Sequence, residues 1–560
     1  MGTDAGLSPT VSFFCGHSPP ELMASLLNER VEADQEGCAR MGWRVFWVPR
    51  DAERGGVRKG VLEGWGDLSS REDEVGVRAG DPIFLSPDHW VDPVLSLYGQ
   101  SRVFRKYTAE TKRNYTTDIA LLLTSLSNRG KSWTEATPKD LEDYEDWRCH
   151  AAANPNQIGG SKWDRELAAF TSLYGWAKKA GYLTRNPVLM REVVGPNGEV
   201  RTVAEQKAVD SRPSNVHWLT PRTWDLWTDV GLRGHTRDGV PQPGWVGRLE
   251  DRNVAFVRTV RSSGLRRLEA GSLLTFEVPE LRLDGGRYYH GKVAAQVTRS
   301  KSARTYYVSA GAVGDTETYR ESSRAWAVRQ AQLAGRYDRL PEMWLVTEVT
   351  RGLKPKVRWC DQNGVIGERD LNKLTWQERT LLFEEGPHGP EPLWLWLNEQ
   401  GLPFQPHSWD GVFRTANQRC EQVLTPPRRM GMDPHKVYAP YATVHAARHS
   451  FALFMLVVLN ELMDRKYGLT PEERRDFRLL YGDPWFLVQN LLGHANRKTT
   501  VKHYLSPVAN LQLESMLATA DTPVDAPMPD LDRVFARVAR NAEGIQDIDD
   551  RMEPRAGDAA

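Results

Sequence analysis

The chain has 560 residues, a length that predicts about three domains. Its apolar share of 40% is enough for more than one core, and its charged share of 26% is ordinary for a globular protein. Lys and Arg number 73, as do Asp and Glu, so the formal net charge is zero. This balance argues against indiscriminate nucleic-acid binding but permits a local basic groove, because attraction to phosphate acts over about 8 Å at physiological salt.

Cysteine usage and hydropathy indicate a cytoplasmic protein. The five cysteines are scattered without paired spacing, which excludes a disulfide framework and the usual zinc patterns. Residues 1–10 lack the basic and apolar regions of a signal peptide. The longest apolar run, Phe451–Leu459, is far shorter than the roughly 20 residues that span a bilayer.

The first part of the chain divides into a mixed segment and a helical one. Residues 1–95 carry no quotable motif, and we expect an accessory region of unknown role. Residues 97–190 show helical apolar spacing throughout and more basic than acidic side chains. The helices expected there are Thr108–Ser127, which begins with a Thr cap, Pro138–Ala153, which follows Thr137, and Trp163–Ala180. Residues 191–215 are polar and are expected to form a linker.

Residues 215–520 return to a globular pattern, with an acidic tail from 521 to 560. A hairpin is expected around Ser300–Ser302, between strands within Leu281–Val308. Residues 335–440 are rich in Pro, Gly and Trp and are expected to be long and irregular, with a short strand at Pro355–Trp359. The helices expected in this part are Asn253–Ser262, a second helix through Leu274, Thr318–Gly335, Ala416–Leu424, Val444–Arg465 and Pro484–Leu492.

Two short motifs could hold an anion. In the first, Gly264 permits a turn, Arg266 opens a helix, and Glu269 either orients an arginine or caps that helix; a surface salt bridge is the plain alternative. In the second, His445 and Arg448 lie one turn apart on a helix anchored by apolar residues. An arginine fork fixed in this way meets two oxygens of a phosphate at once. A histidine and an arginine at this spacing are also common on ordinary protein surfaces, so the pair alone is a weak signal.

A third motif supplies a turn and a phenol. Leu492 ends a helix, Gly493 fits a position of positive φ, and His494 therefore lies on the turn. Thr499 or Thr500 can cap the next helix, which carries Tyr504. A tyrosine in such a place is far more often a packing residue than a nucleophile. The stretch 443–505 nonetheless brings two histidines, an arginine and a tyrosine together in the manner of a phosphate-handling site.

Taken in order, these motifs resemble those of the tyrosine recombinase family, the phage-integrase type. The first arginine box of that family is matched by Ser263, Gly264, Leu265, Arg266 and Glu269. Its second box is matched by His445, Arg448, His449, Ser450 and Phe451, and its third by Leu492, Gly493, His494, Thr499, Thr500 and Tyr504. The lysine of its β-hairpin is matched by Lys301, with Arg304 and Val308 in register, whereas Tyr306 and Ser309 depart from the pattern. Arg304 is the alternative cation of the hairpin.

The resemblance implies a mainly α protein with the tyrosine recombinase fold. Residues 97–190 would be a helical, SAM-like core-binding domain that contacts DNA. Residues 215–520 would be a mixed α+β catalytic domain with a small antiparallel sheet and an insertion around 310–440.

The family's chemistry implies a role for each matched residue. Tyr504 would form a 3′-phosphotyrosine, Arg266 and Arg448 would bind the non-bridging oxygens, and His494 would donate to the phosphate. His445 would assist proton transfer, Lys301 would protonate the leaving 5′ oxygen, and Glu269 would support the site. Such chemistry needs no metal or other cofactor. The basic residues expected to contact DNA are Lys178, Lys179, Arg428, Arg429, Arg497 and Lys498.

We therefore expect a site-specific integrase or recombinase of a mobile element. It would bind double-stranded DNA with specific recombination sites and would act on that DNA as a homotetramer. A possible further partner is an accessory directionality factor, and no association with a membrane is expected. A type IB topoisomerase uses similar chemistry, and a non-catalytic DNA-binding relative would keep only the fold. A helical scaffold whose motifs are accidents is the remaining alternative.

Overall fold

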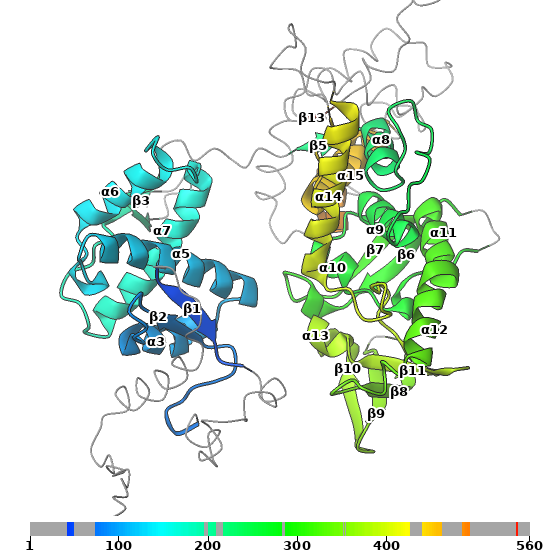
Figure 1. Cartoon of the computed structure of the whole chain (residues 1–560), viewed down its shortest axis with the longest axis horizontal. Helices are drawn as coiled ribbons and strands as arrows, with labels where there is room; N and C mark the ends of the chain where they lie inside the picture. Colours follow the sequence, from blue (N-terminus) through cyan, green and yellow to red (C-terminus); the bar gives the residue numbers. More distant parts are fainter. Residues whose placement is uncertain are drawn as a thin grey trace, which may run out of the picture. The chain divides into compact units, whose positions relative to one another are not determined.

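The computed structural model describes residues 42–49, 73–194, 200–208, 217–282, 286–350, 352, 354–425, 439–461, 484–492 and 545–546. The chain divides into two compact units between Pro213 and Ser214 (Figure 1). Helices in the described part are all too short or too polar to cross a lipid bilayer.

The first unit is mainly helical. Its helices are α3 (Pro93–Gln100), α4 (Arg102–Arg105), α5 (Ala109–Asn128), α6 (Pro138–Cys149) and α7 (Gly160–Lys179). Its strands form two antiparallel pairs, β1 (Arg44–Trp47) with β2 (Pro82–Leu85), and β3 (Met190–Val194) with β4 (Val200–Ala204).

Capping residues fix where the helices of the first unit begin. The Thr108 hydroxyl accepts from the Thr111 backbone N–H at the start of α5, as the sequence predicts. Thr137 and Asp140 form a reciprocal capping box at the start of α6, which satisfies two backbone donors that the helix leaves unpaired. Local sequence alone is therefore enough to determine where α5 and α6 begin.

The larger of two apolar clusters in the described part of the first unit packs its helices together, and the smaller one lies around Val48, Ile83 and Leu85. The larger cluster is built from buried side chains of α5, α6 and α7, and Phe84 and Leu95 belong to the same core. The segment before residue 97 thus shares the core of the helices that follow it. The stretch after Met190 is not the simple linker that we expected, because it forms the β3–β4 pair. The Trp163 indole N–H also donates to the Gln206 carbonyl (2.7 Å), which fastens this stretch to α7.

Where the structure describes it, the second unit combines helices with three separate sheets. Its helices are α8 (Pro221–Gly231), α9 (Glu250–Ser263), α10 (Arg267–Gly271), α11 (Ala310–Tyr319), α12 (Ala325–Leu333), α13 (Trp376–Arg379), α14 (Trp409–Leu424), α15 (Val444–Glu461) and α17 (Pro484–Leu492). Its strands are β5 (Trp218–Leu219), β6 (Tyr288–Val293), β7 (Arg304–Ser309), β8 (Trp344–Thr350), β9 (Lys356–Asp361), β10 (Ile366–Asp370), β11 (Leu382–Gly386), β12 (Gly389–Pro392) and β13 (Ile545–Gln546). The expected organisation, a helical unit followed by a mixed α+β unit, is confirmed.

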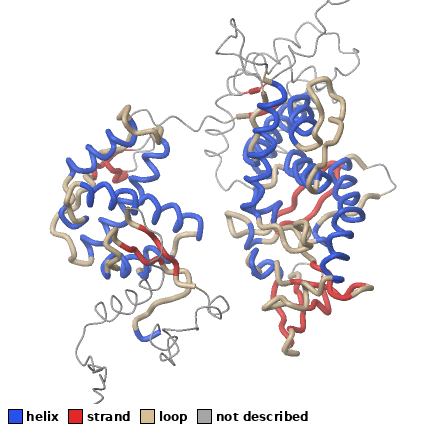
Figure 2. Tube along the Cα trace, in the orientation of Figure 1, coloured by secondary structure: helices blue, strands red, loops and turns tan. Residues whose placement is uncertain are grey.

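A five-stranded sheet occupies the segment that we expected to be irregular. Its strand order is β10-β9-β8-β11-β12, and only the β8–β11 pair is parallel. Figure 2 shows these strands gathered at one end of the second unit. Strand β9 follows a period of two, with Val357 and Trp359 buried on one face and Arg358 exposed on the other, and it overlaps the short strand expected at Pro355–Trp359. The expectation of irregular structure is therefore wrong for residues 344–392.

The hairpin β6–β7 is antiparallel, with Val293 opposite Arg304. Its connection runs from 294 to 303 and contains a 3₁₀ turn at Ala295–Val297, so it is longer than the tight turn expected at Ser300–Ser302. Lys301 lies in this connection rather than on a strand. The first-arginine helix α10 is also shorter than expected, since it ends at Gly271 and not near Leu274.

Candidate functional site

The first arginine motif is built on a left-handed glycine. Gly264 ends α9 with φ of 63°, and the buried Leu265 then leads into Arg266, the N-cap residue of α10. The Glu269 carboxylate accepts from the backbone N–H of Arg266 (2.9 Å) and from its guanidinium (2.9 Å). Glu269 therefore does both things that the sequence left open: it caps α10 and orients an arginine.

A second arginine shares the same carboxylate. Arg304, the first residue of β7, donates from Nη2 to Glu269 (2.6 Å) and from Nη1 to the Leu491 carbonyl (2.9 Å). The Glu269 side chain is fully buried, which by itself would raise its pKa. The positive charges of Arg304, Arg448 and Arg266 outweigh that burial, so the pKa of Glu269 is lowered and the carboxylate stays ionised.

The third arginine comes from α15. Arg448 is only 1% exposed, and it donates from Nη1 to the Gly264 carbonyl and from Nη2 to the Leu492 carbonyl, both at 2.5 Å. The guanidinium thus joins the end of α9 to the end of α17. Arg266 and Arg304 thus pair with the Glu269 carboxylate, and Arg448, from a distant part of the chain, acts on the same carboxylate through its charge.

The remaining residues of the second box have separate surroundings. His445 is exposed on α15, and its ring makes an edge contact with buried His449, with centroids 4.3 Å apart. Ser450 accepts from the Leu219 backbone N–H and from the Trp224 indole, each at 3.0 Å. Ser450 therefore anchors α15 to β5 and α8. The sequence motif named Ser450 as a match but carried no signal for this contact, because the partners lie more than 220 residues away.

Lys301 stands apart from the arginines in its contacts. It is exposed, its φ is 54°, and its ammonium donates to the Gln296 carbonyl within the same hairpin connection (2.7 Å). A non-glycine residue in the left-handed region carries backbone strain. The hairpin thus presents two cations in different settings, an exposed Lys301 and an Arg304 whose side chain is only 11% exposed.

The other predicted site residues fall into two groups. Those outside the described residues are Tyr504, His494, Arg428, Arg429, Arg497 and Lys498. Lys178 and Lys179 are exposed in the last turn of α7, in the first unit. Within the described part of the chain, no group of three or more His, Cys, Asp or Glu side chains is arranged to hold a metal ion.

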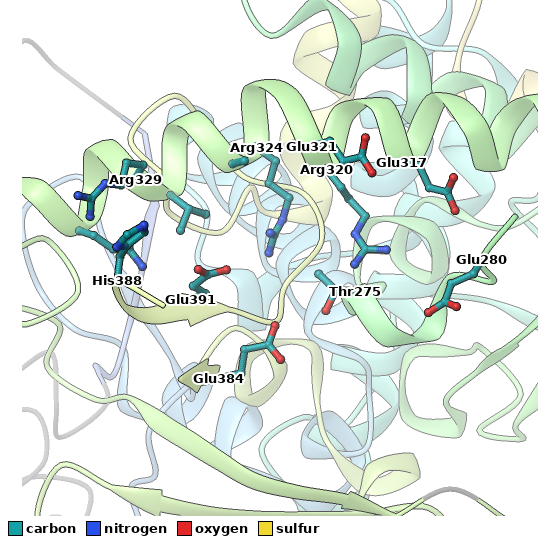
Figure 3. Close-up of a pocket in the computed structure, with 13 residues that line it drawn as sticks. Thr275, Glu280, Glu317, Arg320, Glu321, Arg324, Arg329, Glu384, His388 and Glu391 are labelled. Carbon is teal, nitrogen blue, oxygen red and sulfur yellow. The ribbon is translucent and has the colours of Figure 1, made fainter. Parts of the chain in front are cut away.

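A separate hollow of about 660 Å³ lies between the α11–α12 helices and strands β11 and β12 (Figure 3). Glu384 and Glu391 stand directly opposite each other on the two strands, and Arg320 and Arg324 reach the hollow from the π-helical turn between α11 and α12. Arg324 is buried there, with its guanidinium on the carbonyls of Trp394 and Leu395. None of the site residues predicted from the sequence lines this hollow, and its mixed charges select no single ligand.

A family model matches part of the first unit. Residues 102–181 match the phage integrase N-terminal SAM-like domain. This match covers α4 to α7 and confirms, for that segment, the resemblance that the motifs of the second unit indicate. A search of curated proteins finds no match.

The solved structures to which the chain is similar include recombinases and an integrase. The crystal structure of XerA recombinase is 13% identical, with 77% of this chain and 98% of that chain covered and a TM-score of 0.26. The XerH site-specific recombinase in its pre-cleavage complex with difH substrate is 11% identical, with coverage of 77% and 84% and a TM-score of 0.35. The integrase from mycobacterium phage Brujita is 12% identical, with coverage of 80% and 97% and a TM-score of 0.20.

Proposed function

Because residues 102–181 belong to the phage integrase N-terminal SAM-like domain family, we propose that this chain is a DNA strand transferase of the tyrosine recombinase type. The observation that carries the proposal is the buried Glu269 carboxylate, which pairs with both Arg266 and Arg304 while the positive charge of Arg448 also acts on it. The carboxylate holds the partly exposed Arg266 guanidinium in a fixed orientation, and a guanidinium fixed in this way can bind two oxygens of a DNA phosphate at once.

The two arginines proposed to bind phosphate would do so differently. The side chain of Arg266 is 24% exposed, so its guanidinium can meet a phosphate directly. Arg448 is buried and would add positive charge from the interior. A guanidinium has five N–H donors, so it can hold backbone carbonyls and an oxyanion together. Removing one preorganised donor of this kind costs about 10²–10³ in rate.

The chemical step follows from the third motif. The Tyr504 hydroxyl oxygen attacks the scissile phosphorus, a 3′-phosphotyrosine forms, and the bond to the 5′ oxygen breaks. The leaving oxygen takes a proton from Lys301 and departs as a hydroxyl. His494 donates to the phosphate, and His445 accepts the proton that the Tyr504 hydroxyl loses as it attacks. The phosphotyrosine bond keeps the energy of the phosphodiester, so rejoining needs no further energy source.

Formation of a covalent adduct tests this proposal even while the target sequence is unidentified. The chain is incubated with nicked duplexes that carry a random central sequence, and DNA that stays attached after denaturation is recovered and sequenced. We expect an adduct that is lost in Tyr504→Phe and falls about 10²–10³-fold in Arg266→Ala. Arg248→Ala is the matched control, because Arg248 also pairs with a glutamate, Glu399, but on the surface. An adduct that persists in Tyr504→Phe would remove Tyr504 from this role.

The biological role is a further part of the proposal. We propose that the enzyme recombines two DNA sites of a mobile element as a homotetramer, with an accessory protein setting direction. A plasmid with two recovered sites should yield deletion or inversion products. Relaxation of a supercoiled plasmid without recombinant products would favour the topoisomerase alternative. A chain that binds the sites but forms no adduct would be the non-catalytic relative.

A further inference from the structure

We propose that a groove beside the hairpin β6–β7 binds the DNA strand that carries the released 5′ end, in an unpaired form. This inference rests on the proposed function, since a released 5′ end arises only if the chain cleaves DNA. The groove has a volume of about 790 Å³ and lies between the hairpin and the five-stranded sheet, where it meets Thr350 of β8 and Pro355 just before β9. The Asn372 side chain joins the two walls, because its oxygen accepts from the Ala295 backbone N–H (3.2 Å).

The groove adjoins the arginine cluster. Arg304 lines it at the start of β7 and also pairs with Glu269. Ala294 and Ala303 line it as well, and they are the two ends of the hairpin connection that carries Lys301. In the proposed chemistry, Lys301 gives its proton to the leaving 5′ oxygen. The released strand would therefore begin next to the groove.

One face of the hairpin offers the groove aromatic and basic side chains. Tyr288, His290 and Lys292 are alternate residues of β6, so they share a face, and each is exposed. Thr305 lies directly opposite Lys292 on β7 and extends that face. All four residues line the groove. Rings on which bases stack, next to cations that meet phosphates, are what single-stranded DNA requires of a protein surface.

The charge of the hairpin complements a phosphate backbone. Residues 287–314 contain five Lys or Arg and no Asp or Glu, in a chain whose net charge is zero. The exposed cations among them are Arg287, Lys292, Arg299 and Lys301. Two carboxylates line the groove from the opposite side, and one of them, Glu277, is paired with Arg379; the other is Glu280. The hairpin wall of the groove is thus purely basic.

Size and apolar surface favour an unpaired strand over a duplex. The volume falls within the range of about 300–1,000 Å³ that is typical of small-molecule pockets, so it suits one or two nucleotides better than a length of duplex. Val278, Val349 and Leu371 give the groove apolar surface beside its aromatic rings. In a duplex the faces of the bases are stacked on one another, whereas an unpaired base can place its face against such surface.

Binding of DNA with and without an unpaired 5′ end tests the inference. The full chain with Tyr504→Phe is used, so that the proposed cleavage does not consume the DNA. Two nicked duplexes are compared, identical except that one carries three unpaired thymines with a free 5′ hydroxyl at the nick, called the flap. We expect the flap to tighten binding at least about 5-fold, the lower end of what stacking one base on a ring contributes. Equal affinities by fluorescence anisotropy would overturn the inference.

Aromatic substitutions locate the gain. Tyr288→Ala and His290→Ala should each remove most of the gain from the flap, while affinity for the fully paired duplex changes less than about twofold. Trp326→Ala is the matched control, because Trp326 is an exposed ring on α12 that does not line the groove. Equal weakening of flapped and fully paired DNA by Tyr288→Ala would make this face a duplex contact and overturn the inference.

A basic pair of variants tests the phosphate contact. Lys292→Ala should lower the slope of log affinity against log salt for flapped DNA by about 0.7, the value for one phosphate of a single strand. Arg287→Ala removes the same charge from the same hairpin outside the groove, and it should leave the gain from the flap unchanged. A gain that depends on Arg287 and not on Lys292 would contradict the groove.

Photochemical cross-linking identifies the bound nucleotide directly. With 4-thiothymine at the first unpaired position, we expect cross-links to residues 288–292 or to the ends of β8 and β9, found by mass spectrometry. Cross-links confined to other segments would overturn the inference. Absence of a Tyr504-dependent adduct in the unsubstituted enzyme would contradict the proposed function instead, and would leave the binding of an unpaired strand by the groove standing.

Discussion

Glu269 is the residue on which the arginine cluster depends. Within the described part of the chain, it is the one carboxylate in contact with Arg266 and Arg304, and its side chain is fully buried. Removing a single partner from a buried ion pair leaves the opposite charge uncompensated. The stability of the second unit should therefore be unusually sensitive to this position, although Glu269 touches no substrate atom in the proposed mechanism.

We predict that Glu269→Gln destabilises the second unit by about 3–5 kcal/mol at pH 7. The folded-state pKa of Glu269 is lowered by the arginines, so its stabilising contribution is present above the unfolded value of about 4.3 and is lost as pH falls through the folded value. Urea unfolding should show the gap between the two proteins narrowing below about pH 4. A gap that stays constant down to pH 3 would contradict the assignment of charge.

Glu145 on α6 should respond to pH in the opposite direction. Burial, then the neighbouring charge of Asp146, raises the pKa of Glu145 to about 7, although His150 opposes the shift. A raised folded-state pKa means that the contribution of Glu145 is fully present below about 4.3 and is lost as pH rises through 7. Glu145→Gln should equal the unsubstituted protein in stability at pH 4 and exceed it increasingly up to pH 8.

Thermal unfolding across pH 4–8 measures this trend. Glu142→Gln is the matched control, because Glu142 is exposed on the same helix and its replacement removes the same charge. A stability gap for Glu145→Gln that shrinks as pH rises would reverse the sign and contradict the burial argument.

The contacts of Arg304 show which single-residue interactions the sequence does not predict. Arg266 and Glu269 are three residues apart, so their pairing follows from helix geometry and could be predicted. The Leu491 carbonyl that Arg304 binds lies 187 residues away and is a backbone atom, which carries no side-chain signature. The motif therefore indicates Arg304 only as the alternative cation of the hairpin.

At the scale of elements, the turn at Gly264 joins three helices. Gly264 ends α9 in the left-handed region, and its carbonyl accepts from Arg448 of α15. A Cβ at this position would collide with the Phe451 ring of α15 and approach Leu492 of α17. The glycine is needed both for its backbone conformation and for the close approach of α15.

We predict that Gly264→Ala destabilises the second unit by the sum of two effects, about 1–2 kcal/mol from the left-handed backbone and about 1–3 kcal/mol from overpacking. Gly239→Ala separates them, because Gly239 has φ of 77° but open space around it. That control should lose only the backbone part. Chemical denaturation measures both. Equal losses in the two variants would show that Phe451 yields without penalty.

Helices are easier to predict than sheets in this chain, for a physical reason. The beginnings of α5 and α6 follow from local caps, and α17 coincides with its predicted bounds, Pro484–Leu492. Of the five-stranded sheet, the sequence predicts only the part of β9 within Pro355–Trp359, where buried and exposed residues alternate. Strands β10, β11 and β12 are short and contain Gly, Pro, Glu or Asp, residues with low strand propensity, and the parallel β8–β11 pair joins strands that are far apart in the sequence.

For the whole molecule, the net charge of zero gives no general attraction to DNA, so DNA affinity depends on where basic side chains cluster on the surface. If the exposed lysines at the end of α7 contact phosphates, each should release counterions on binding. We predict that DNA affinity falls steeply with salt, and that Lys178→Ala/Lys179→Ala lowers the slope of log affinity against log salt by about 2. Fluorescence anisotropy across 50–200 mM salt measures this. An unchanged slope would exclude both lysines as phosphate contacts.

The five-stranded sheet begins and ends at neighbouring points. Trp344 at the start of β8 pairs with Leu382 of β11, whose neighbour Phe383 pairs with Pro392 at the end of β12. Two strand spacings, about 10 Å, therefore separate the entry of residues 344–392 from their exit. A few residues are enough to bridge that span. An insertion or deletion of the whole sheet would therefore leave the order and connection of the helices unchanged. Such an exchange would also have to replace the apolar contacts of Val357 and Phe383 and the buried Arg379, which donates to the Ser272 carbonyl and pairs with Glu277.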